Sequence, residues 1–113
     1  MASEVNPKVP IKLDKKRHLL LDLNAMVAFE DVTGINMMRG FDASKMTVKE
    51  FRAFLWACLI HEDKDLTLDT VGGMIHTANM DTITSCLIEA WNVAIPEAGE
   101  EAEDPLADKS PAG

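Results

Sequence analysis

Three carboxylates at short spacing in the middle of the chain raise the question of a calcium loop. The acids of the segment HEDKDLTLDTVGG, which begins at His61, are Asp63, Asp65 and Asp69. With Asp63 at position one of such a loop, position six should be glycine for the sharp turn and position twelve a bidentate glutamate. Those positions hold Leu68 and Met74. The sequence therefore predicts no calcium site here, but a solvated connection, HEDKD, followed by a capped helix.

Other reactive patterns give the same result. The three histidines, His18, His61 and His76, form no i, i+4 pair with one another or with a cysteine, and the chain has neither a G-x-S-x-G elbow nor a glycine-rich phosphate loop. Glu30 could serve as a catalytic acid, but an acid on a helix surface is far more often solvated. The sequence therefore predicts no enzyme, no cofactor and no metal, and favours function through binding.

Charge and composition limit the class of partner. The 113 residues suit one domain, and their net charge is −8. Six acids against one lysine give residues 97–113 a net charge of −5, which leaves −3 for residues 1–96. We expect no basic face for nucleic acid, no membrane-spanning run and no secretory signal. Cys58 and Cys86 lie in apolar runs and are predicted to be small buried residues.

The first part of the chain predicts a β-hairpin. After a flexible leader, residues 1–8, Val9, Ile11 and Leu13 alternate with polar or proline positions, which is the pattern of a half-buried strand. Pro10 places this strand at an edge, and the turn is expected at residues 14–16. Because an isolated two-stranded ribbon is only marginally stable, the hairpin must pack on other elements.

Helix signals follow along the chain. Asn24 is a predicted N-cap and Gly34 a C-terminal stop, and Ala25, Ala28, Phe29 and Val32 share one face between them. Thr47 and Glu50 form a capping box before a helix that should reach about His61. The predicted inner face of this helix consists of Phe51, Phe54, Leu55, Cys58 and Leu59.

Two more helices are expected before the chain becomes acidic. Thr67 caps the first, which Gly72 and Gly73 should keep short or bent, and Asn79 caps the second, which Pro96 should end. The fold class is therefore α+β and mostly α, with an N-terminal hairpin packed on a small bundle of four or five helices. We expect a single domain over residues 9–96 and a disordered acidic tail over residues 97–113.

An excess of apolar residues suggests a protein partner. A domain of this size has little interior, so some of its flexible or aromatic side chains are expected to form a partner-binding or self-associating surface. The alternative is that each of them simply completes the core. The predicted partner-binding residues are Met37, Met38, Phe41, Trp56 and Ile60.

Several of these segments also occur in a recognisable order. After the hairpin comes a helix with the motif N-A-x-x-x-x-E-x-x-x-G, which contains Asn24, Glu30 and Gly34. The next helix carries a W-A-x-L motif that begins at Trp56. It is followed by an H-E-D-x-x-L-T-x-x-x-V-G segment that includes Thr67 and ends at Gly72. Over about residues 9–92 this order resembles the tail assembly chaperones of long-tailed bacteriophages and related gene transfer agent proteins. The Gly72–Gly73 pair departs from the family's more common Gly-acid continuation, which leaves the length of that helix open.

The resemblance implies a small, mostly helical protein that binds the tape measure protein and helps tail tube subunits polymerise around it. Such proteins act in the cytoplasm of the infected bacterial host and are absent from the finished virion. In many phages a frameshift yields a longer form, which a protein sequence does not reveal. Two alternatives stay open, namely a minor structural tail or connector subunit, and an acidic regulatory adaptor that binds through residues 97–113.

Overall fold

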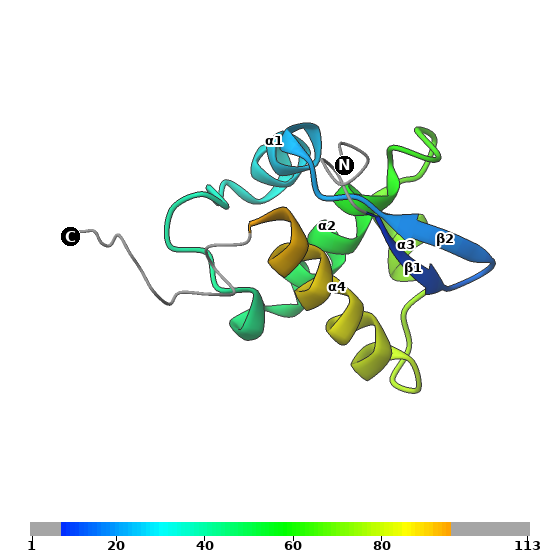
Figure 1. Ribbon diagram of the computed structural model, residues 1–113. Helices are drawn as coiled ribbons and strands as arrows, with labels where there is room; N and C mark the ends of the chain where they lie inside the picture. Colours follow the sequence, from blue (N-terminus) through cyan, green and yellow to red (C-terminus); the bar gives the residue numbers. More distant parts are fainter. Residues whose placement is uncertain (1–7, 96–113) are drawn as a thin grey trace, which may run out of the picture.

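The computed structural model of the chain describes residues 8–95, in which a β-hairpin is followed by four α-helices and one 3-10 turn (Figure 1). This confirms the predicted fold class. The predicted tail, Pro96 and the leader up to residue 7 lie outside the described residues. In chain order the elements are β1 (Val9–Lys12), β2 (Lys16–Leu19), α1 (Leu23–Thr33), η2 (Ala43–Lys45), α2 (Val48–Leu59), α3 (Leu68–Gly72) and α4 (Met80–Ala94).

The hairpin follows the predicted alternation. β1 and β2 are antiparallel, with Val9 opposite Leu19 and Ile11 opposite Arg17, and all four of these residues are buried. The strand is one residue shorter than predicted, because the N–H of Leu13 already donates to the carbonyl of Lys15 in the turn, at 3.0 Å. The hairpin lies against α2 and α4, so its apolar face is covered by helices.

Helix α1 ends as predicted but begins differently. Gly34 closes it with φ 77° and donates its N–H to the Glu30 carbonyl. The N-cap is Asp22, whose carboxylate accepts the N–H of Ala25 at 3.0 Å, so the prediction of Asn24 was wrong. An aspartate two residues earlier satisfies the free N–H of the first turn, which leaves Asn24 inside the helix. The predicted inner face is buried around Ala25, whereas Val32 is exposed near the helix end.

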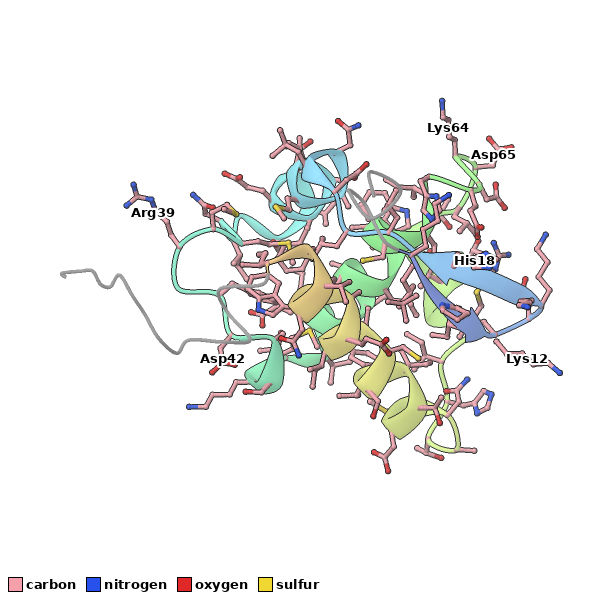
Figure 2. All side chains as sticks on the ribbon, in the orientation of Figure 1. Lys12, His18, Arg39, Asp42, Lys64 and Asp65 are labelled. Carbon is pink, nitrogen blue, oxygen red and sulfur yellow. The ribbon has the colours of Figure 1, made fainter. Side chains whose placement is uncertain are left out.

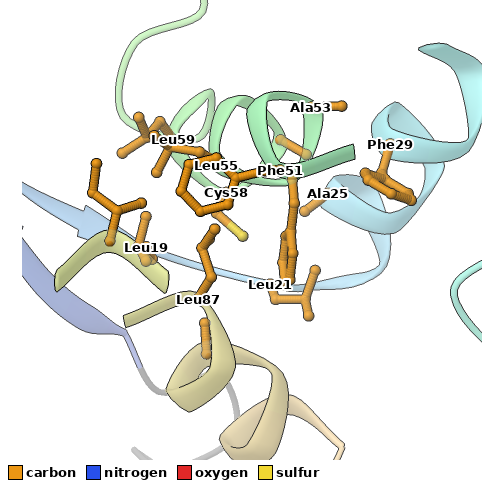
Figure 3. Packing of buried hydrophobic residues seen from close by; sticks show 14 of the residues in the cluster. Leu19, Leu21, Ala25, Phe29, Phe51, Ala53, Leu55, Cys58, Leu59 and Leu87 are labelled. Carbon is orange, nitrogen blue, oxygen red and sulfur yellow. The ribbon is translucent and has the colours of Figure 1, made fainter. Parts of the chain in front are cut away.

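Helix α2 is the central element of the core. Its capping box is present as predicted, with the side chain of Thr47 accepting the Glu50 N–H and the Glu50 carboxylate accepting the Thr47 N–H. The helix ends at Leu59, two residues before the predicted end. All five predicted inner residues are buried, and they are Phe51, Phe54, Leu55, Cys58 and Leu59. Figure 3 labels four of them, Phe51, Leu55, Cys58 and Leu59.

The last two helices are positioned by short-range contacts. Thr67 caps α3 as predicted, and α3 is only five residues long. Asn79 stands at the start of α4, but its side chain makes no capping bond to α4. Its amide instead donates to the carbonyl of Met74 and accepts the N–H of His76, both at 2.9 Å. The side chain of Asn79 therefore stabilises the turn before α4 rather than the first turn of the helix.

A polar cluster ties the hairpin to the loop after α2. Arg17 is buried, with 4% of its surface exposed, and it donates to both carboxylate oxygens of Asp14, at 2.7 and 2.9 Å. A second carboxylate, from Asp63, lies 4.0 Å from the Arg17 guanidinium. A buried guanidinium without such partners would be strongly destabilising, so these carboxylates are part of the packing.

Two histidines extend this cluster. Glu62 accepts the backbone N–H of His18 at 3.0 Å and lies 2.9 Å from the His18 ring, while the His61 ring lies 2.7 Å from the His18 carbonyl. HEDKD is solvent-accessible as predicted, but it also makes contacts that the sequence analysis did not foresee. Two of its three acids, Glu62 and Asp63, pair with β2, because the fold brings together residues that are far apart in the sequence.

The hairpin cluster makes stability sensitive to acid. The hydrogen bond from Arg17 lowers the pKa of Asp14 from 3.8 to about 2. Because this pKa is lower in the folded state, the unfolded chain takes up the proton first. The contribution of Asp14 to stability is present above pH 3.8 and is lost as the pH falls toward about 2.

We therefore predict that Asp14→Asn lowers the free energy of unfolding at neutral pH and removes part of its decrease between pH 4 and pH 2. Urea unfolding followed by circular dichroism at several pH values measures both effects. Retention of the full wild-type pH dependence in the variant would contradict this role of Asp14.

The two cap glycines provide a matched pair of substitutions. Gly34→Ala should lower the free energy of unfolding by about 1 kcal/mol, because φ 77° is unfavourable for any residue with a Cβ atom. Gly73→Ala should change it by less than about 0.5 kcal/mol, because Gly73 has φ −71° and space for a methyl group. Urea unfolding of both variants measures the difference, and equal effects would contradict the assignment.

Candidate protein-binding groove

An open groove of about 450 Å³ lies between the start of α1 and the end of α2. We call it the α1–α2 groove. It contains two of the predicted partner-binding residues, Trp56 and Ile60, and both are half-buried. Its lining residues are Asp22, Asn24, Ala25, Trp56, Ala57, Ile60, His61 and Lys64.

Trp56 is fixed in this groove by one hydrogen bond. Its indole N–H donates to the carbonyl of Leu66 at 3.0 Å. Leu66 is itself buried, so the bond links the loop after α2 to the helix. A large ring held at its polar end presents its apolar part to the groove at little entropic cost. Trp56 is thus positioned both to close the core and to contact a partner.

Charged groups of both signs stand at the rim. Asp22 is partly occupied with capping α1, and His61 is bonded to the hairpin, so these two side chains are held in place. Lys64 is exposed and projects from the loop (Figure 2). An apolar centre with a mixed polar rim is the usual composition of a protein-binding surface.

Two exposed apolar residues of α1 lie close to the groove in sequence but are not part of its lining. Leu23 is 70% exposed and lies between two lining residues, Asp22 and Asn24. Val27 is 50% exposed and follows Leu23 by four residues, so the two side chains lie one above the other on the helix. The sequence analysis missed both. The sequence pattern identified the inner face around Ala25, but the exposure of apolar residues on the opposite face was not considered.

The other predicted partner-binding residues lie elsewhere. Met37 is 3% exposed, so the prediction that it forms surface was wrong, because the loop after α1 turns its side chain into the core. Met38, its neighbour, is 64% exposed. Phe41 packs edge-on against Phe29 and Trp91, with ring centres 5.3 and 5.2 Å apart. The five predicted residues therefore do not form one patch.

The residues of the family signature are mostly structural. Gly34 and Thr67 cap helices, and Glu30 is exposed while its backbone carbonyl accepts the Gly34 N–H. A Cβ atom on Gly72 would lie 3.2 Å from the Cδ atom of Arg52, so a glycine here allows α3 and α2 to approach closely. Asn24 and Trp56 are the exceptions, since both line the groove.

The described part of the chain offers few groups for covalent or metal chemistry. Burial raises the pKa of both thiols, Cys58 and Cys86, which disfavours the reactive thiolate. Cys86 is half-buried rather than buried as predicted, because it lies on the α4 face near the Pro10 carbonyl. Within residues 8–95, no three histidine, cysteine or acidic side chains gather as a metal site, and no helix is long and apolar enough to cross a membrane.

Trp56→Phe should lower the free energy of unfolding by about 1–2 kcal/mol, because the buried carbonyl of Leu66 loses its donor. Trp91→Phe serves as the matched control, since a phenyl ring can keep the edge contact with Phe41 and should cause a smaller loss. Urea unfolding followed by circular dichroism compares them. A larger loss for Trp91→Phe would contradict the role assigned to the indole N–H.

Comparison with known proteins adds no relative from which a role could be transferred. No protein family model, no curated protein and no solved structure matches the chain. The functional argument therefore depends on the residues and their geometry.

Proposed function

We propose that this protein is a tail assembly chaperone that holds the tape measure protein of a long-tailed bacteriophage, together with tail tube subunits, during tail assembly. The observation that carries the proposal is the order and spacing of the hairpin, the helix with Asn24 and Gly34, the Trp56 helix and the segment ending at Gly72. The protein would act in the bacterial cytoplasm and would not remain in the finished virion.

The spacing of the apolar residues in the α1–α2 groove supports this proposal. A tape measure chain consists of long helices whose apolar faces aggregate until the tail tube covers them. An amphipathic helix binds a partner through apolar anchors one turn apart. Trp56 and Ile60 are themselves one turn apart on α2, and Leu23 and Val27 repeat that spacing on α1. The pair on α2 lies in the groove, and the pair on α1 is a second exposed apolar site outside the groove lining.

The strength of such binding would depend on a few anchors. In most interfaces a small set of large apolar or aromatic residues near the centre contributes most of the binding energy, and the polar rim contributes little. Trp56 fits the description of a central anchor, because it is half-buried and held in one orientation. Lys64 and Asp22 at the rim would orient the bound helix rather than determine its affinity.

A substitution on the exposed face of α1 tests the proposal. Leu23→Asp should weaken binding of the tape measure protein by about tenfold or more, because it places a charge on the apolar contact surface. Co-expression followed by co-purification shows whether the complex forms, and titration of purified components measures its affinity. Without this protein, the tape measure chain should be largely insoluble.

The matched control is Val48→Asp. Val48 is 76% exposed and is the first residue of α2, just as Leu23 is the first residue of α1. An acidic side chain is compatible with the first turn of a helix at both positions, so both variants should fold. Equal binding by the two variants would rule out the exposed face of α1 as part of the binding surface. A tape measure chain that is equally soluble without this protein would rule out the chaperone role.

Mass spectrometry of purified particles separates the proposal from the structural alternative. A chaperone should be absent from the finished particle, whereas a minor tail or connector subunit should be present in it at fixed stoichiometry. Detection of this chain in purified virions would therefore favour the structural role.

A further inference from the structure

The hairpin concentrates positive charge in an otherwise acidic chain. Residues 8–17 contain five of the eleven cationic side chains and a single acid, Asp14. Both carboxylate oxygens of Asp14 are already bonded to Arg17, so Asp14 does little to neutralise the neighbouring lysines. The prediction of no basic face followed from the net charge of residues 1–96, and the hairpin departs from that average locally.

Two of these lysines flank a groove on the hairpin. It has a volume of about 450 Å³ and is lined by Pro10, Ile11, Lys12 and Lys16. We call it the hairpin groove. Lys12 lies opposite Lys16 in the strand register, and both are exposed, so the two ammonium groups stand beside an apolar floor. Figure 2 shows Lys12 projecting away from the body of the protein.

The charges of the other grooves differ. The α1–α2 groove has Asp22 facing Lys64, and a groove of about 420 Å³ beside Phe41 and Trp91 has Asp42 and no lysine or arginine in its lining. The hairpin groove has two lysines and no carboxylate in its lining. A segment with many acids and one apolar anchor would match this groove better than the other two of similar volume.

Such a segment occurs in the chain itself, after the last described residue. Residues 97–108 contain six acids and one large apolar residue, Leu106. We propose that this acidic segment binds the hairpin groove of the same chain, with carboxylates against Lys12 and Lys16 and Leu106 against the apolar floor.

The chain is long enough for this contact. The sulfur of Cys86, in α4, lies 3.9 Å from the carbonyl of Pro10 in the groove. From Cys86 to Ile95, at the end of α4, the helix advances roughly 14 Å at about 1.5 Å per residue. The eleven residues from Ile95 to Leu106 span up to roughly 36 Å when extended at about 3.3 Å per residue. The segment therefore needs neither to stretch fully nor to unfold α4.

A spin label on the acidic segment of the full-length protein tests the contact. The label is attached at Ala107→Cys in a Cys86→Ser background, where Cys58 is fully buried and protected from labelling. At low salt, the amide NMR signals of Ile11, Lys12 and Lys16 should lose about half their intensity. They should recover in about 0.5 M salt, where the Debye length is only a few ångströms.

Two paired variants separate a specific contact from general charge attraction. Lys12→Gln with Lys16→Gln should abolish the signal loss. Lys45→Gln with Lys49→Gln removes the same charge from exposed positions near the start of α2 and should leave it unchanged. Because altered lysines could disturb the hairpin, a third variant changes the six acids of residues 97–108 to their amides. It leaves the described fold untouched and should also abolish the loss.

A mixing experiment shows whether the acidic segment binds the hairpin groove of its own chain or that of a second copy. Spin-labelled protein without ¹⁵N is mixed with unlabelled ¹⁵N protein, so that only contacts between two molecules reduce the signals. Signal loss that appears in this mixture and disappears on dilution would show that a second copy is bound and would overturn the proposal. Full intensity of the hairpin amides at low salt in the directly labelled protein would overturn it as well.

Discussion

The structure depends on the complete burial of one face of helix α2. Phe54, Leu55, Cys58 and Leu59 have no exposed surface, and β2, α1, α3 and α4 all pack against α2. Neither a two-stranded hairpin nor a five-residue helix is stable alone in water. Each becomes stable because it covers part of α2, so the fold is a set of short elements arranged around one apolar helix (Figure 3).

The same helix connects the core with the candidate binding site. Its fully buried stripe organises the fold, and the neighbouring strip with Trp56 and Ile60 faces the α1–α2 groove. The hydrogen bond from Trp56 to Leu66 fixes the loop after α2, and that loop supplies Glu62 and Asp63 to the hairpin. The groove and the hairpin are therefore positioned through one short segment, which includes the acids that first suggested a calcium loop.

Features that depend on nearby residues could be predicted from the sequence. The capping box at Thr47, the αL stop at Gly34 and the buried stripe of α2 each follow from side chains within one or two turns. Features that depend on the path of a loop could not. The burial of Met37 is one such feature, and the pairing of His18 with Glu62, 44 residues away, is another.

Half of the groove was predictable, because Trp56 and Ile60 lie beside the main stripe of α2. Its α1 half, which includes Asp22 and Asn24, was not, because it depends on how the start of α1 packs against the end of α2.

The positions of the two indole rings give the protein its own optical reporters. The chain has no tyrosine, so its near-ultraviolet emission comes from Trp56 and Trp91. The former stands in the open groove with its N–H bonded to a carbonyl, and the latter belongs to the ring cluster with Phe41. A ligand seated on the groove changes the surroundings of one fluorophore, and loosening of the ring cluster changes those of the other. Binding at the groove and loosening of the ring cluster are therefore followed separately through intrinsic tryptophan fluorescence, without any added dye.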